Sequence, residues 1–105
     1  MDDSYEIAFE LILHAGNSRS QSILAVREAE NGNFDKAGEH MKEAERELKL
    51  AHDIQTGLLS REAEGDPQNI SLLMVHAQDH LSMAMSQREM SSQIIRLYQR
   101  LENMK

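Results

Sequence analysis

The chain has 105 residues, a formal net charge of −7 at pH 7, one proline and no cysteine, and this length predicts a single domain over 1–105. Without cysteine there are no disulfides, zinc–thiolate sites or thiol catalysis, and the acidic chain shows no evident basic face of the kind that a nucleic-acid-binding protein needs. No apolar run reaches the roughly 20 residues of a membrane span, and the acidic start lacks the basic segment of a secretory signal, so we expect a cytoplasmic protein that does not insert into a membrane.

Two clusters of turn-forming residues divide the chain into three segments. The first is "ENGNFD" at 30–35, where Asn-Gly is a strong helix stop, and the second is "EGDPQN" at 64–69. Asn33 is a candidate N-cap for the segment after the first break, and Asn69 or Ser71 for the segment after the second. Proline and glycine are rare elsewhere, which favours helices. The predicted helices span about 3–31, 34–63 and 70–104.

The first helix carries a stripe of mostly small residues that would let a neighbouring helix approach closely. Gly16 and Asn17 lie in its middle and are a candidate kink, since glycine costs about 1 kcal/mol relative to alanine there. His14 is expected at the surface or at the boundary of the core. The stripe consists of Ala8, Leu11, Ala15, Ser18, Ser22, Ala25 and Ala29.

The second helix follows a heptad pattern, with apolar residues at alternating spacings of three and four. One polar residue, Gln55, interrupts it. We expect His40 at the surface or boundary, and His52 in a hydrogen-bonded core cluster with Gln55 and Thr56. The apolar positions are Phe34, Ala37, Met41, Ala44, Leu48, Ala51 and Leu58.

The third helix has two stripes that would face inwards, whereas a helix in a three-helix monomer needs only one. We therefore predict that the second stripe is buried by another copy of the chain. The first stripe is Leu73, Ala77, Leu81, Ala84, Ile95 and Tyr98, and the second is His76, Asp79, Met83, Met90 and Leu97.

Polar residues cluster in "VHAQDHLSMAM" at 75–85. At about 100° per residue, His76, Asp79 and His80 share one broad face of the helix, while Gln78 lies about 200° from His76. If Gln78 assists His76, it must therefore come from a different copy of the chain. This geometry favours a site built between subunits.

The residues alone leave three interpretations open. His76 and His80 could bind zinc as an i, i+4 pair, although the glutamate of a His-Glu-x-x-His motif is missing; Asp79 copies meeting on an axis would suit magnesium. His76 could be a nucleophile that accepts a phosphoryl group, because its imidazole is largely neutral near pH 7. The whole cluster could also be a solvated helix face.

Four collinear segments carry a resemblance to a known family. They are "HAGNSRS" at 14–20, "AENGNFDKA" at 29–37, "LAHDIQTGLLSREAEG" at 50–65 and "SLLMVHAQDHLSMAM" at 71–85. Together they resemble the enzyme IIA component of the lactose/cellobiose class of the bacterial phosphoenolpyruvate-dependent sugar phosphotransferase system. The chain departs from the commonest family motif at Ser82, Met83 and Ala84, where Met-Thr usually follows the leucine.

The resemblance implies an all-α protein, an antiparallel three-helix bundle that assembles as a homotrimer. It implies that His76 accepts a phosphoryl group from the histidine phosphocarrier protein and passes it to a cysteine of the cognate IIB component, during uptake of a β-linked disaccharide through the IIC permease. Asp79 matches an aspartate that binds a divalent cation, usually taken as Mg²⁺, at the trimer axis, with one cation per trimer. Gln78 and His80 match auxiliary positions near the active site.

Two other functions compete with the phosphoryl carrier. One is a non-catalytic helical regulator or scaffold that retains the fold, and the other is a metal-binding bundle that uses His76 and His80. The sugar is not specified by the sequence, because the IIA component contacts other proteins rather than the sugar.

Overall fold

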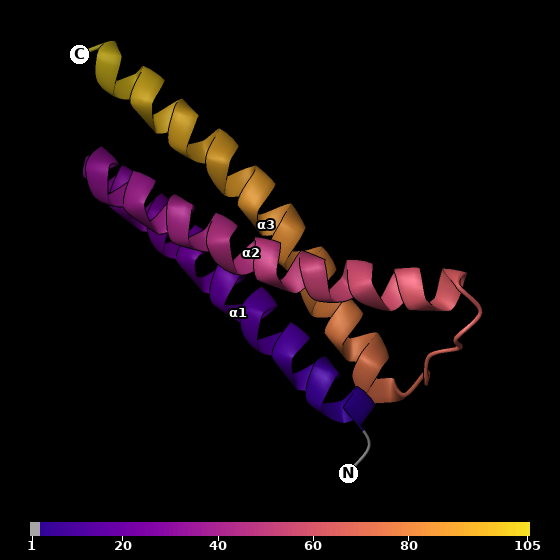
Figure 1. Cartoon of the computed structure of the whole chain (residues 1–105). Helices are drawn as coiled ribbons and strands as arrows, with labels where there is room; N and C mark the ends of the chain where they lie inside the picture. The colour runs from indigo at the N-terminus through magenta and orange to yellow at the C-terminus, as the bar shows by residue number, and fades with distance from the viewer. Residues whose placement is uncertain (1–2) are drawn as a thin grey trace.

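A computed structural model, which describes residues 3–105, consists of three α-helices joined by two short connections (Figure 1). The helices are α1 (Asp3–Glu30), α2 (Phe34–Ala63) and α3 (Leu72–Asn103). The predicted all-α fold is therefore confirmed, and each helix end lies within two residues of its predicted position. None of the three helices carries an apolar stretch that could cross a bilayer within residues 3–105.

Helix α1 makes most of the contacts between helices in the bundle. It packs extensively against both α2 and α3, whereas α2 and α3 contact each other much less and diverge towards the connection between them (Figure 1). Every residue of the predicted small-residue stripe on α1 is buried. The helix also continues without interruption through Gly16 and Asn17, so these residues do not end it.

The core is long and thin, in a molecule measuring 57 × 24 × 19 Å. Alanines supply most of its buried apolar side chains, and Leu11 and Leu81 are the largest that are fully enclosed. A polar layer of serines is buried as well. Ser18 Oγ donates to the carbonyl of Ala44 across the α1–α2 contact at 2.8 Å, and Ser91 Oγ accepts from Gln87 Nε2 at 3.1 Å.

Glycines end the first two helices as the sequence predicts. Gly32 and Gly65 adopt positive φ angles of 80° and 94°, which residues with a Cβ atom rarely adopt. After the second break, Ser71 is the N-cap of α3, and its Oγ accepts a hydrogen bond from the backbone N–H of Met74 at 3.0 Å. Of the two candidate caps, the serine is therefore the one that is used.

Asn33 is the N-cap residue of α2, as predicted, but it does not cap the helix with its side chain. Its Nδ2 instead donates to Glu28 Oε2 at 3.0 Å. The tight turn after α1 brings Asn33 back over that helix, since its backbone N–H bonds to the carbonyl of Glu28 at 2.8 Å.

These two caps allow a stability test with an internal control. We expect Ser71→Ala to lower the free energy of unfolding by about 1 kcal/mol, because it removes a side-chain bond to a helix N-terminus. Asn33→Ala should cost clearly less, since no capping bond is lost. Urea denaturation followed by circular dichroism measures both, and equal losses in the two variants would contradict the capping assignment.

Candidate functional site

The polar cluster of α3 lies on the outward face of its first turns. Ser71 fixes the start of the helix, and Met74, Ala77 and Leu81 are buried against the other helices. Of the residues between these buried positions, His76 and Asp79 point away from the bundle, whereas Gln78 does not. His76 and Asp79 are exposed, which leaves both side chains accessible from outside this chain.

The two histidines of this cluster are in direct contact. Nε2 of His76 lies 3.1 Å from Nε2 of His80, and the ring centroids are 4.5 Å apart in an edge-to-face arrangement. Helix periodicity predicts that the two share a face, and the structure adds the contact between their ring nitrogens. Within residues 3–105 no set of three or more His, Asp or Glu side chains could hold a metal ion, so this pair finds no third ligand among these residues.

Gln78 faces away from His76, as the helical geometry predicts. It lies between α2 and α3, where its Oε1 accepts a hydrogen bond from Gln55 Nε2 at 2.7 Å, and its Nε2 lies 3.7 Å from the sulfur of Met74. This contact also explains why a polar residue interrupts the apolar pattern of α2. Gln78 therefore does not contact the His76 of its own chain.

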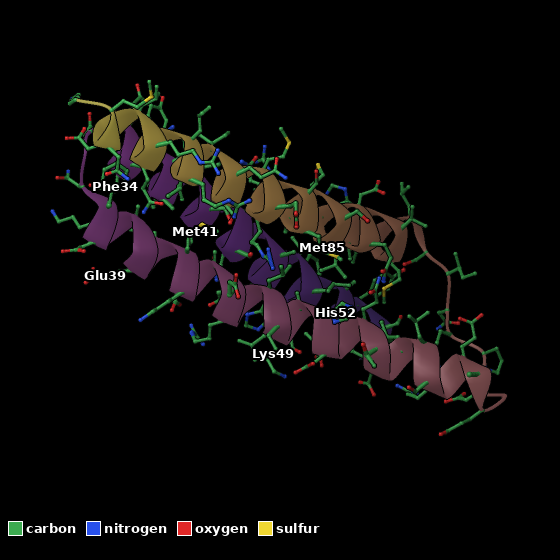
Figure 2. The ribbon with its side chains drawn as sticks, turned by 90° about the horizontal axis from the view of Figure 1, so that it is seen from above. Phe34, Glu39, Met41, Lys49, His52 and Met85 are labelled. Carbon is green, nitrogen blue, oxygen red and sulfur yellow. The ribbon has the colours of Figure 1, made fainter. Side chains whose placement is uncertain are left out.

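The core position predicted for His52 is wrong. His52 is exposed and borders a cavity of about 280 Å³ between α2 and α3, where Met85 lines the opposite side (Figure 2). The physical reason is that His52 follows the buried Ala51 and is rotated by about 100° from it. The remaining lining residues are Glu45, Leu48, Lys49 and Arg88.

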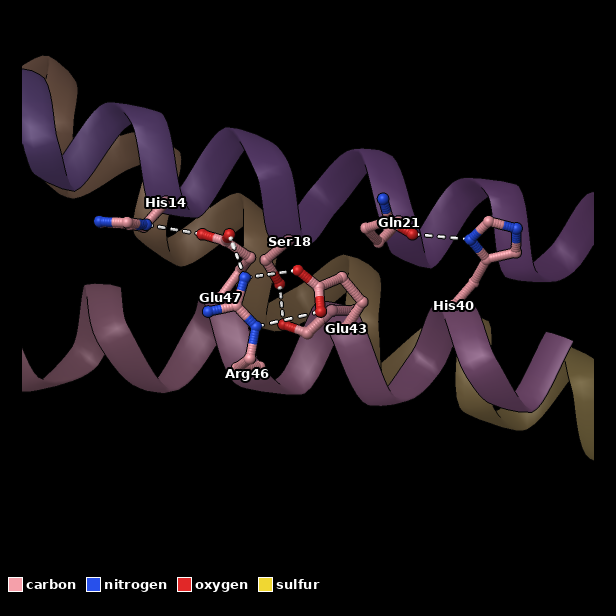
Figure 3. Close-up of polar contacts among 8 residues, drawn as sticks. His14, Ser18, Gln21, His40, Glu43, Arg46 and Glu47 are labelled. Atoms are coloured by element: carbon pink, nitrogen blue, oxygen red, sulfur yellow. Dashed lines mark hydrogen bonds and ion pairs between the residues drawn. The ribbon is translucent and has the colours of Figure 1, made fainter. Parts of the chain in front are cut away.

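The other two histidines lie at the core boundary, as predicted, and join α1 to α2. His14 Nδ1 lies 2.6 Å from Glu47 Oε2, and His40 Nδ1 lies 2.6 Å from Gln21 Oε1 (Figure 3). Both rings are half-buried. They belong to the α1–α2 contact, so they have a structural use that is independent of the histidines on α3.

Glu47 is a buried charged residue that the sequence interpretation missed. It is only 7% exposed, and its other oxygen, Oε1, lies 3.0 Å from Arg46 Nη2. Arg46 also binds Glu43 through two hydrogen bonds of 2.6 and 3.0 Å. Glu47 lies three residues after the buried Ala44 and four before the buried Ala51. This helical spacing is the signal in the sequence that could have predicted its burial.

Arg46 holds the pKa of Glu43 below its usual range, mainly through these hydrogen bonds. A carboxyl whose pKa is lower in the folded chain stabilises the fold above its unfolded pKa. That contribution is lost as the pH falls through the lowered folded value. Since Glu43 lies at the solvent surface, screening keeps the effect small.

Comparison with known proteins identifies the family. The family model for the lactose/cellobiose-specific IIA subunit of the phosphotransferase system matches residues 6–99. The chain belongs to this family. It is therefore an enzyme IIA, a component of a phosphotransferase, and the resemblance found in the sequence is confirmed.

Curated relatives are similar over almost the whole length of this IIA component. The lichenan-specific phosphotransferase enzyme IIA component of Bacillus subtilis (strain 168) is 41% identical, over 95% of this chain and 91% of its own. The cellobiose-specific EIIA component of Lactococcus lactis subsp. lactis (strain IL1403) is 36% identical, over 96% and 87%.

Solved IIA structures have the same fold. The cellobiose-specific enzyme IIA of Bacillus anthracis superimposes with a TM-score of 0.95 at 40% identity, covering 98% of this chain and 94% of that one. The chitobiose IIA of Escherichia coli, solved in complex with HPr, gives a TM-score of 0.82 at 32% identity, covering 97% and 99%. These structures confirm the helical bundle.

The buried carboxylate of this IIA component yields a stability prediction. Glu47→Ala removes the partner of His14 and leaves that half-buried ring without its hydrogen bond, so we expect a loss of about 1–3 kcal/mol in the free energy of unfolding. The matched control is Glu45→Ala, which removes an exposed carboxylate 3.5 Å from Arg88 and should cost less than about 0.5 kcal/mol. Chemical denaturation compares the two, and similar losses would mean that the His14–Glu47 contact contributes little.

Proposed function

We propose that His76 is the phosphoryl carrier of this IIA component. It receives the phosphoryl group from the histidine phosphocarrier protein, HPr, and passes it to a cysteine of the cognate IIB component, in support of β-linked disaccharide uptake through the IIC permease. The observation that carries the proposal is an exposed imidazole on a long, capped helix, with the second imidazole of His80 against its ring nitrogen. The relative solved with HPr supports the choice of donor.

The proposed chemistry suits such a position. A neutral imidazole is a competent nucleophile, and the ordinary histidine pKa of about 6.5 leaves much of it neutral near pH 7. Phosphoryl transfer depends mainly on positioning and on compensating the charge of the phosphoryl oxygens. An exposed ring on a rigid helix can meet a donor protein and then an acceptor protein at the same place.

Homotrimer formation belongs to the same proposal. The stripe of α3 that contains His76 and Asp79 continues through Met83, Met90 and Leu97, which are 45%, 56% and 58% exposed. Apolar side chains aligned along an outer helix face are typical of a surface that another protein covers. Three copies of α3 packed through Met83, Met90 and Leu97 would bury these side chains around a common axis.

Asp79 is the residue of this stripe that fits the proposed divalent cation, Mg²⁺, because its carboxylate supplies oxygen ligands. It makes no hydrogen bond or ion pair within residues 3–105 and is exposed, so its oxygens are available. Oxygen ligands are those that Mg²⁺ prefers. Three carboxylates brought together at an axis would repel one another unless a cation or protons compensated them.

Intact mass spectrometry tests the carrier function. Incubation with phosphoenolpyruvate, enzyme I and HPr should add one phosphoryl group that is labile in acid and stable in base, and His76→Ala should abolish the gain. His52→Ala, which changes an exposed histidine on α2, should behave like the wild type. A wild-type chain that gains no mass would favour the regulator or scaffold instead.

Analytical ultracentrifugation tests the assembly and the cation. Wild type should sediment as a trimer at neutral pH, and a chelator should weaken it because the Asp79 carboxylates then repel. Asp79→Leu should form a trimer that is insensitive to the chelator. Asp53→Leu, an exposed substitution on α2, should retain the wild-type sensitivity. A monomeric wild type would refute the trimer, and a wild-type trimer unaffected by the chelator would refute the cation.

A further inference from the structure

The contact between the two imidazoles of α3 restricts where their protons lie. The two Nε2 atoms are 3.1 Å apart, and the ring planes meet at 85°. At this distance, with neutral rings, one Nε2 donates a proton and the other accepts it through its lone pair. The hydrogen bond therefore fixes the tautomer of both rings.

His80 is the side chain that orients the His76 ring. Within residues 3–105, no other side chain is hydrogen-bonded to His76, and Asp79 contacts neither ring. The pair lies on the outward face of α3, with His76 exposed and His80 half-buried. A hydrogen bond in such a place adds little to the stability of the fold, so its effect should appear in the chemistry of His76.

We propose that His80 donates its Nε2 proton to Nε2 of His76, so that His76 keeps its own proton on Nδ1 and holds the Nε2 lone pair for the phosphoryl group. This inference rests on the proposed function. The nitrogen that attacks phosphorus needs a lone pair, which lies on Nε2 of His76 if His80 donates and on Nδ1 if His76 donates. Nδ1 is bonded to the ring carbon that carries Cβ and lies beside the helix, whereas Nε2 is at the outer edge of the ring.

The transfer then proceeds without loss of a proton from the nucleophile. The Nε2 lone pair of His76 forms a new nitrogen–phosphorus bond, while the nitrogen–phosphorus bond of the donor phosphohistidine breaks and its electron pair returns to the donor ring. The donor ring is protonated on its other nitrogen and leaves as a neutral imidazole, and the phosphorylated His76 ring becomes an imidazolium. The proton on Nδ1 of His76 stays in place. The N–H of His80, released from the lone pair that now binds phosphorus, donates to a phosphoryl oxygen and compensates its charge.

Two substitutions separate this role from a structural one. His80→Leu removes the donor, whereas His80→Gln retains an N–H that can reach the same place. His52→Leu controls for the loss of a histidine elsewhere. The first measurement is the ¹⁵N NMR spectrum of the His76 ring in the unphosphorylated chain at about pH 8.5, well above the ordinary histidine pKa. The second is the rate of phosphorylation by phosphorylated HPr, and thermal unfolding checks that each variant folds.

We expect wild-type His76 to carry its proton on Nδ1, and His80→Leu to show a mixture of both tautomers. His80→Leu should be phosphorylated about 10–100-fold more slowly, the loss expected for one hydrogen bond to a charged group. His80→Gln should recover most of the rate, and His52→Leu should match the wild type.

A wild-type His76 with its proton on Nε2 overturns the proposal even if no variant folds. A His80→Leu chain as fast as the wild type, or a His80→Gln chain as slow as His80→Leu, overturns it as well. Failure of the wild type to accept any phosphoryl group refutes the proposed function instead, and the NMR measurement still reports the direction of the hydrogen bond.

Discussion

The close approach of α1 to both of its neighbours is the constraint on which this structure depends. The stripe that α1 buries contains alanines, serines and a single leucine, so short side chains separate the helices. Each of these residues removes little apolar area from water, and stability must accumulate from many well-packed contacts rather than from a few large side chains. Larger residues in the stripe would force α1 away from α2 and α3 together.

This packing decides which face of α3 remains free. Because α1 and α2 cover one side of α3, the opposite side carries His76, Asp79, Met83 and Met90. The N-cap at Ser71 holds the first turn in place, so the histidine pair lies on ordered backbone near the beginning of the helix. A nucleophile that must meet two protein partners in turn benefits from such a fixed position.

The sequence was sufficient for the features that depend on helical period and on turn chemistry. The small-residue stripe of α1 and the glycine stops could be predicted because both are local rules. His52 was placed wrongly because the face that it shares with Gln55 and Thr56 was taken to be the core face, although His52 is turned by about 100° from the buried Ala51 that precedes it. Glu47 was missed because a carboxylate is usually exposed, and because its partner His14 lies on α1, far from it in the sequence.

The contact between His76 and His80 required the actual side-chain conformations, since periodicity places two rings on one face without joining their nitrogens. The residues from His76 to His80 show how a helix places adjacent residues on separate surfaces. His76 and His80 face outwards as a pair, Asp79 joins the exposed stripe, and Gln78 turns to α2 and bonds to Gln55. Because α2 and α3 have few other contacts, the hydrogen bond between the Gln55 and Gln78 side chains helps to hold α2 against the helix that carries the histidines. Adjacent residues of one short motif therefore support the fold, the proposed assembly and the proposed chemistry separately.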